Sequence, residues 1–362
     1  MIPTIVLVGP PRSAGGGVLA FCDSLERGLS RLGVPTDRLW IGAGRGDDND
    51  IAGSMMGVKA LIRALPSIWA KSGVGKVVHL NTSFTQKAVL RDAVLYAIAR
   101  LHRSKVLTEF HGGSPSQITD PVSKAAMRLL CNSNAVVVIN QRQLQQFRDL
   151  YPSLGNRLHL IFNAVELPDV DLDSAIQHRL RHPRVAYVSR LVAEKGLLET
   201  VHAVGILRQR GVNVALDVCG GGPARSEVEK AVREERIEDL VLFHGHVPVA
   251  DTGALLREAS ILSLPSYYKS EGQPMCIIEA FAWGLPVIGS NVEPVSFMVQ
   301  EGVHGASVPP RNAEAVADAI QRLLSDHKAY DLIARNNRAL AEESYNLERS
   351  SKRFQDLYLG SI

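Results

Sequence analysis

A chain of 362 residues is too long for one small hydrophobic core, so we expect two domains with separate cores. The composition, with 46% hydrophobic and 21% charged residues, is typical of a globular protein and excludes a long disordered or low-complexity chain. The net charge of +3 is unevenly divided, because the first 170 residues carry a basic excess and the rest an acidic one. An anionic partner or membrane surface is one explanation, and chance is the other.

The cysteines indicate a reduced, cytoplasmic compartment, because they lie far apart and form no zinc-ligand spacing. They are Cys22, Cys131, Cys219 and Cys276. The apolar run from Met1 to Pro10 has no basic region before it, and we interpret it as a first β-strand rather than a signal peptide. No stretch reaches the roughly 20 apolar residues that cross a bilayer. We therefore expect neither a metal site nor a transmembrane segment.

Short apolar, β-rich runs alternate with longer helical stretches, a pattern that predicts parallel sheets. The runs of the first half are Thr4 to Gly9, Arg38 to Gly42, Val77 to Leu80, Val106 to Glu109 and Ala135 to Asn140. Those of the second half are Arg184 to Ser189, Val214 to Cys219, Val241 to Gly245, Ile261 to Pro265, Pro286 to Gly289 and Gly305 to Val308. We therefore expect an α/β fold with two doubly wound, Rossmann-like domains.

A polar segment with two prolines separates the two series of strands. It predicts a first domain over residues 1–166, a linker over residues 167–183 and a second domain over residues 184–345. A C-terminal helix over about residues 346–362 could pack back on the first domain. Ligands of open α/β sheets bind at the carboxyl ends of the strands. We expect these two edges to face each other across a cleft that forms the active site.

The stretch from Ser54 to Lys76 is basic and partly amphipathic, with Trp69 and several aliphatic side chains beside four Lys and Arg residues. Trp and Lys together suit an anionic membrane surface, so peripheral contact with the inner face of the plasma membrane is one hypothesis. The alternative is an ordinary helix packed on the sheet with a solvated cationic face. We expect no nucleic-acid partner.

Two cations follow the first strand of the second half, in the segment VAYVSRLVAEKG. Arg190 can hold two oxygens of a diphosphate, and Lys195 supplies a compact point charge. The alternative is a solvated loop with two ordinary surface charges. One βαβ unit later, the segment DVCGGGP places Gly221 and Gly222 between a strand and a helix, where backbone N–H groups can approach an anion. A tight turn explains such glycines equally well, and the missing G-x-G-x-x-G pattern argues against a dinucleotide cofactor.

Two glutamates separated by seven residues, Glu271 and Glu279, bracket the segment EGQPMCIIE. Pro274 predicts the first turn of a helix, which leaves Glu271 in the preceding loop and Glu279 about one turn inside. The residues around Glu279 are apolar, and a carboxylate in such a helix needs a partner. Sugar hydroxyl groups are suitable donors. The alternatives are a helix-dipole interaction or a neighbouring Arg.

Together these segments resemble the retaining glycosyltransferases of family four, also called glycosyl transferases group 1, which have the GT-B fold. The resemblance covers most of the second half through SRLVAEKG, CGGGP, FHGHVP, LPSYYKSEGQPMCIIEAFAWGLPVIGS and EGVHGASVPP. The first half is similar more loosely, through SAGGG, EFHGG and FNAVE. Two departures concern the family's glycine pair after PVIGS, where this chain has Glu293-Pro294, and its Phe-Gly pair, where this chain has Gln273-Pro274.

The resemblance implies a role for each matching residue. Arg190 and Lys195 would hold the donor diphosphate, Glu279 the ribose, and Glu271 hydroxyls of the transferred sugar. His111 would line the reaction centre, where we favour a positioning role over that of a general base. The remaining donor-binding residues would be Gly16, Gly17, Asn163, Gly221, Gly222, His246, Val247, Gly272, Gln273, Pro274 and Met275.

The implied reaction is transfer of a hexose-type sugar, with retention of configuration, from a nucleotide-sugar to a glycan or lipid-linked acceptor. A UDP-sugar is favoured and GDP-mannose is possible, in bacterial surface polysaccharide or lipopolysaccharide biosynthesis. The chain offers no clear protein nucleophile, so we expect front-face attack with no metal and no cofactor. The alternatives are an inverting GT-B transferase or a nucleotide-sugar epimerase, a catalytically silent GT-B partner subunit, and a dinucleotide-dependent oxidoreductase, for which the fingerprint is missing.

Overall fold

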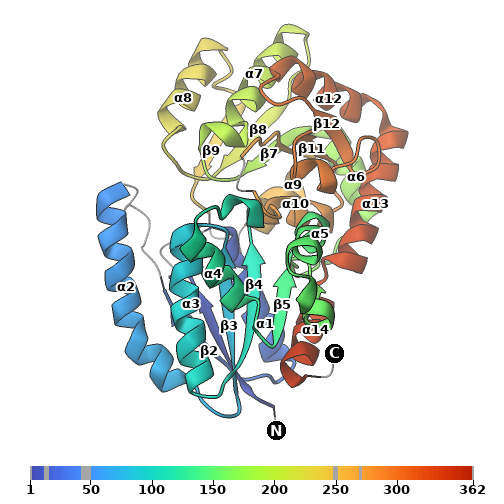
Figure 1. Ribbon diagram of the computed structural model, residues 1–362. Helices are drawn as coiled ribbons and strands as arrows, with labels where there is room; N and C mark the ends of the chain where they lie inside the picture. Colours follow the sequence, from blue (N-terminus) through green and yellow to red (C-terminus); the bar gives the residue numbers. More distant parts are fainter. Residues whose placement is uncertain (1, 12–15, 42–49, 248–251, 269–270, 361–362) are drawn as a thin grey trace. The chain divides into compact units, whose positions relative to one another are not determined.

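The computed structural model describes residues 2–11, 16–41, 50–247, 252–268 and 271–360, and over residues 50–60 the backbone alone. The chain divides into two compact units. Unit 1 consists of Met1–Ala164 together with Leu347–Ile362, and unit 2 consists of Val165–Asn346. Each unit has a parallel sheet covered by helices (Figure 1).

The sheet of unit 1 has six parallel strands in the order β2-β1-β3-β4-β5-β6. They are β1 (Thr4–Gly9), β2 (Thr36–Trp40), β3 (Lys76–Ser83), β4 (Lys105–His111), β5 (Ala135–Val138) and β6 (Leu158–Leu160). The strand order reverses between β1 and β3, where a ligand can enter between diverging connections. Five of these strands match runs predicted from the sequence, whereas β6 is too short, at three residues, to give a pattern.

Helices cover both faces of this sheet. Helix α1 (Gly17–Arg31) and the C-terminal helix α14 (Leu347–Leu359) pack on one face, through side chains that include Phe21 and Phe354. Helices α2, α3, α4 and α5 pack on the other face. Their bounds are α2 (Asp50–Lys71), α3 (Gln86–Leu101), α4 (Pro121–Leu130) and α5 (Gln141–Leu150), with 3-10 turns η1 (Pro115–Gln117) and η2 (Pro152–Arg157). Helix α14 thus belongs to unit 1, although all of unit 2 precedes it in the chain.

The sheet of unit 2 has six parallel strands in the order β12-β11-β10-β7-β8-β9. They are β7 (Arg184–Val188), β8 (Ala215–Cys219), β9 (Val241–Gly245), β10 (Ile261–Leu264), β11 (Val287–Ser290) and β12 (Gly305–Val308). The order reverses between β7 and β10. The helices of unit 2 are α6 (Leu172–Arg181), α7 (Leu197–Gln209), α8 (Arg225–Glu234), α9 (Thr252–Glu258), α10 (Met275–Ala282), α11 (Val295–Met298), α12 (Ala313–Ser325) and α13 (His327–Ser344), with the 3-10 turn η3 (Ala193–Lys195).

The segment 167–183, which the sequence predicts to be a linker, contains helix α6 and lies wholly in unit 2. Its polarity is explained by a single buried stripe, in which Ile176 packs against Tyr330 of α13. The acidic run before it is also structural. The side chain of Asp171 caps α6 by accepting from the backbone N–H groups of residues 173 and 174, and Asp173 pairs with Arg335.

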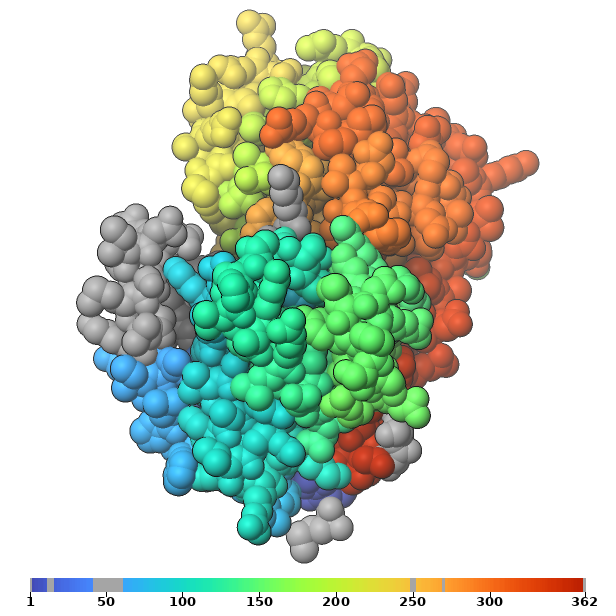
Figure 2. All heavy atoms as spheres, viewed as in Figure 1, coloured from blue at the N-terminus to red at the C-terminus, as the bar shows by residue number. Residues whose placement is uncertain are grey.

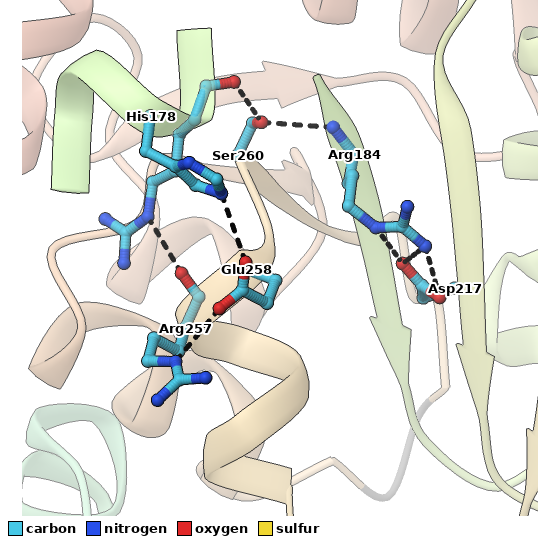
Figure 3. A network of polar contacts seen from close by, with 7 residues as sticks. His178, Arg184, Asp217, Arg257, Glu258 and Ser260 are labelled. Carbon is cyan, nitrogen blue, oxygen red and sulfur yellow. Dashed lines mark hydrogen bonds and ion pairs between the residues drawn. The ribbon is translucent and has the colours of Figure 1, made fainter. Parts of the chain in front are cut away.

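Polar side chains fix the beginning of β7 (Figure 3). The guanidinium of Arg184 donates two hydrogen bonds to the carboxylate of Asp217 on β8, at 2.8 and 2.9 Å. The backbone N–H of Arg184 donates to Ser260, the residue before β10, at 3.0 Å. On the neighbouring helices His178 contacts Glu258 at 3.1 Å. These contacts join the start of β7 to the middle of β8 and to the residue before β10.

Candidate functional site

The carboxyl ends of β7, β8 and β10 meet where the strand order of unit 2 reverses. Arg190 follows β7, the glycines follow β8, and Ser266 follows β10. Parallel neighbouring strands deliver these three loops to one edge of the sheet. Residues that are 76 positions apart in the chain consequently come into contact there.

Lys195 and Glu271 form the centre of this edge. The Lys195 ammonium donates a hydrogen bond to Oε2 of Glu271, which also accepts from the Ser266 hydroxyl at 3.2 Å. Only 9% of the lysine side chain and 11% of the glutamate side chain are exposed. The approach depends on Gly196, at φ 79°, because a Cβ there would lie 2.7 Å from the carbonyl oxygen of Pro265.

Arg190 is exposed and lies beside the same pair. Its guanidinium carbon is 5.8 Å from the ring centre of Tyr268, and the Lys195 Nζ is 5.3 Å from that ring. One aromatic ring therefore contacts both cations that the sequence assigns to a diphosphate. Tyr268 belongs to no charged or glycine-rich pattern, and only its place between β10 and Glu271 marks it in the sequence.

Two of the three glycines after β8 are needed for close packing of the backbone. A Cβ on Gly220 would lie 1.8 Å from the carbonyl oxygen of Ser189, and one on Gly222 would lie 2.3 Å from that of Leu191. The Leu191 N–H donates to the carbonyl oxygen of Gly221 at 3.0 Å. Only Gly221 has open space around its Cβ position. Two of the glycines thus let the loops after β7 and β8 come together, which leaves Gly221 able to face a ligand.

Glu279 occupies the second turn of α10, an otherwise apolar and buried helix. Burial raises the pKa of its carboxyl group to about 7, and a hydrogen bond with Thr252 partly opposes this shift. Burial also raises the pKa of Cys219 at the end of β8; the backbone N–H of Val247 opposes this rise, and the charge of Glu279 adds to it. Glu279 and Val247 therefore lie around one thiol, while His246 is exposed beside them.

Cys276 links the two glutamates. Burial raises the pKa of its thiol to about 12, with Glu279 and Glu271 adding to the rise and Lys195 opposing it. All three charged groups therefore act on the same sulfur atom, on the first turn of α10. Through Tyr268 and Cys276, the structure brings Arg190, Lys195, Glu271 and Glu279 into one group.

The segment Gly272 to Met275 lies between these glutamates and is buried. Pro274 is the N-cap of α10 rather than part of its first turn, and Met275 begins the helix. The side chain of Gln273 hydrogen-bonds to Tyr345. Gln273 thus anchors this segment at the position where the family often has Phe. The Glu293-Pro294 peptide bond, at the other departure from the family, is cis and precedes α11.

In unit 1, Gly16 and Gly17 are exposed at the start of α1, and Gly16 has φ 89°. The first three residues of the SAGGG motif fall within residues 12–15, outside the described residues. His111 ends β4 and is only 3% exposed. Burial lowers the pKa of its imidazole to about 3, which leaves the ring neutral near pH 7 and favours positioning over acid–base work. Asn163 is buried after β6.

Within the described residues, no group of three or more His, Cys, Asp and Glu side chains is arranged to hold a metal ion. Across the same part of the chain, every helix is too short or too polar to cross a lipid bilayer.

Residues 171–340 match the model of the family "glycosyl transferases group 1". An alpha-D-kanosaminyltransferase of Streptomyces kanamyceticus is 26% identical over 270 residues, which cover 72% of this chain and 69% of that protein. A GDP-mannose-dependent alpha-(1-6)-phosphatidylinositol monomannoside mannosyltransferase of Mycobacterium tuberculosis is 29% identical over 248 residues, covering 65% and 64% respectively. Among solved structures, Anabaena Alr3699/HepE in complex with UDP and glucose superposes with a TM-score of 0.71 at 18% identity, over 99% of this chain and all of that one.

The chain has the two-domain α/β fold of GT-B glycosyltransferases, as the sequence predicts. The candidate site residues of unit 2 all fall within residues 171–340, the region that matches the glycosyl transferases group 1 model.

Proposed function

We propose that this chain is a retaining, metal-independent glycosyltransferase that moves a hexose-type sugar from a nucleotide-diphosphate donor to a glycan or glycolipid acceptor. One observation carries the proposal: Lys195 and Glu271 are paired at the strand-order reversal of a group 1 glycosyl transferase domain, with Arg190 on the same tyrosine ring. Cations and carboxylates at such an edge suit a ligand that carries both phosphates and hydroxyl groups.

Each charged group has a distinct part in the proposed reaction. Arg190 and Lys195 stabilise the negative charge that grows on the diphosphate as the sugar departs, an effect worth several kcal/mol in a site with little water. Glu271 accepts hydrogen bonds from hydroxyls of the sugar, and Glu279 from those of the ribose. Without a protein nucleophile, the acceptor attacks the same face that the diphosphate leaves, and a phosphate oxygen takes the acceptor proton.

The proposal extends to unit 1 through Gly16, Gly17 and His111, which lie at the carboxyl edge of its own sheet. The two glycines form the N-terminal end of α1, where backbone N–H groups favour phosphate. The ring of Phe21, in the second turn of α1, lies 4.9 Å from that of His111. Unit 1 thus has the imidazole of His111 next to the helix that begins at these glycines.

A UDP-sugar is the favoured donor, supported by the UDP complex of the Anabaena structure, and GDP-mannose is the second candidate, supported by the mycobacterial relative. Assembly of a bacterial surface polysaccharide or lipopolysaccharide is the process that the sequence resemblance implies for such an enzyme. The test is to mix the protein with candidate donors and acceptors and to determine the anomeric configuration of the product by NMR. Retention supports the proposal, whereas inversion, an epimerised nucleotide-sugar, or no turnover with any donor that binds contradicts it.

We also propose that unit 1 contacts an anionic membrane through the exposed sides of α2, α3 and α4, where α3 lies against both neighbours. Figure 2 shows the surface of α3 and α4 in blue-green. The exposed apolar side chains of this surface are Ile62, Trp69, Leu90, Val94, Leu101, Val122 and Leu129. Among the described side chains of these three helices, the exposed charged ones are basic and include Arg63, Lys87, Arg100, Lys124 and Arg128. Cationic and apolar groups side by side suit the interface of an anionic bilayer on the cytoplasmic side. In the stretch from Ser54 to Lys76, residues up to 60 have no described side chains.

A further inference from the structure

Unit 1 contains a cluster of buried polar side chains that includes His111. Its members come from β3, β4 and α14 and are His79, Asn81, Glu109, His111 and Tyr358. Each is at most 4% exposed. Residues 79 and 81 of β3 and residues 109 and 111 of β4 share one face of the sheet, since alternate residues of a strand point the same way. Because these titratable groups are buried away from water, their hydrogen bonds determine which atom carries each proton.

Asn81 determines the protonation of His111. The amide nitrogen of Asn81 donates to the carbonyl oxygen of Val8 at 3.0 Å, which fixes the orientation of the amide. Its oxygen then faces Nε2 of His111 at 2.8 Å and can only accept. The hydrogen atom must therefore be on Nε2, and the neutral ring carries its lone pair on Nδ1.

Glu109 lies on the other side of the cluster. Its Oε2 is 2.9 Å from Nε2 of His79, whose Nδ1 is 2.7 Å from the hydroxyl of Tyr358. Its Oε1 is 3.8 Å from Nε2 of His111 and has no hydrogen-bond partner among the described residues. Burial raises the pKa of Glu109 and lowers that of His79 to about 3. If Glu109 is a neutral acid, its O–H group donates to His79 and no charge is buried. A carboxylate at this place would be a buried charge whose Oε1 accepts no hydrogen bond from the described residues.

We propose that Asn81 and Glu109 are positioning residues that hold His111 as a neutral imidazole with its proton on Nε2. The ring then offers a ligand only the Nδ1 lone pair, which accepts from a hydroxyl group and gives no positive charge to a phosphate. That His111 meets a hydroxyl of the donor sugar rests on the proposed function. The protonation state of the ring does not.

Imidazole ¹H–¹⁵N correlation spectra of the full chain test the protonation state directly, with signals assigned through His79→Gln and His111→Gln. At neutral pH, His111 should show a protonated Nε2 and an unprotonated Nδ1. A proton on Nδ1, or on both nitrogens, overturns the proposal. Glu109→Gln should leave this pattern unchanged, because the amide donates to His79 as the acid does; a changed His111 pattern refutes the neutral acid at position 109.

Asn81→Asp tests positioning, because a carboxylate at this place should draw a second proton onto His111. The matched control is Thr108→Val. Thr108 lies on the opposite face of β4, and the substitution removes its buried hydrogen bond to Ser133. Asn81→Asp should weaken binding of UDP-glucose or GDP-mannose, whichever the wild type binds, by about tenfold, and binding of the corresponding nucleoside diphosphate by less than about twofold. Equal losses for both ligands, or none, overturn the positioning role. If the wild type binds no nucleotide-sugar, the proposed function fails while the spectra still decide the protonation state.

Discussion

The ammonium group of Lys195 is hydrogen-bonded to the carboxylate of Glu271, and this contact joins the loop after β7 to the loop after β10. Both groups are almost fully buried, so each charge compensates the other where little water can solvate it. A diphosphate that approaches Lys195 would separate the pair and free Glu271 for hydroxyl groups. The pair is thus a structural contact that also prepares the proposed site for its donor.

Replacing one member of this pair should cost more stability than replacing both. Lys195→Met leaves a buried carboxylate and Glu271→Leu a buried ammonium, and each should lower the free energy of unfolding by about 3 kcal/mol. The double variant should lose less than either single variant, as measured by urea unfolding. Lys230→Met is the control, because its pair with Glu234 is exposed and should be worth under about 0.5 kcal/mol. Additive losses would show that the two side chains do not interact.

The raised pKa of Glu279 predicts a pH-dependent stability. The folded state holds a proton up to about pH 7, whereas a free glutamate loses it near 4.5. The folded state therefore binds more protons in this window, and stability falls as the pH rises through it. Glu279→Gln should remove this fall, so that its stability relative to wild type grows by up to about 3 kcal/mol between these pH values. Parallel stability curves for the two proteins would contradict the assignment.

The three glycines after β8 should respond differently to alanine. Gly220→Ala and Gly222→Ala should each cost about 1–3 kcal/mol of stability, because their Cβ atoms would collide with the loop after β7. Gly221→Ala should fold within about 0.5 kcal/mol of wild type, since nothing lies within 4 Å of its Cβ position. If Gly221 faces the donor, this variant should nevertheless bind UDP or GDP more weakly. Unfolding curves and calorimetry separate the two effects, and destabilisation by Gly221→Ala would refute the division of roles.

The membrane surface of unit 1 can be tested by vesicle flotation. The double variant Lys87→Glu, Lys124→Glu should bind anionic phospholipid vesicles at least about tenfold more weakly than wild type at low salt, since each basic group near the surface contributes about 1 kcal/mol. Lys230→Glu in unit 2 makes a charge reversal outside this surface and should have no effect. Wild-type protein that stays in the unbound fraction at low salt would refute membrane contact.

The fold could be predicted because regular elements depend on local patterns. The alternation of strands and helices predicted both sheets, and β1, β9 and β12 begin and end at the predicted residues. The pattern failed where burial is confined to a narrow stripe. Helix α6 was hidden in an apparent linker, because Ile176 is one of only two buried positions in its ten residues.

The site was only partly predictable. Arg190, Lys195, Glu271 and Glu279 follow strands or bracket a helix, so their order along the chain indicated a common edge. Tyr268, Thr252, Asn81 and Glu109 gain their importance from contacts with residues far away in the sequence, and no local pattern marks such contacts. Gly222 resembles a phosphate-binding glycine in sequence. The structure instead explains this glycine by packing, because a side chain there would collide with the Leu191 carbonyl oxygen.

Calorimetric titration with UDP and GDP shows whether the two cations beside Glu271 hold the diphosphate of a nucleotide-sugar. Wild type and Lys230→Ala should bind one of these nucleotides equally well. Arg190→Ala and Lys195→Ala should bind it at least about tenfold more weakly, as expected when a charged hydrogen bond is lost. Folded Arg190→Ala and Lys195→Ala proteins with wild-type affinity, or a wild type that binds neither nucleotide, would contradict this role of the two cations.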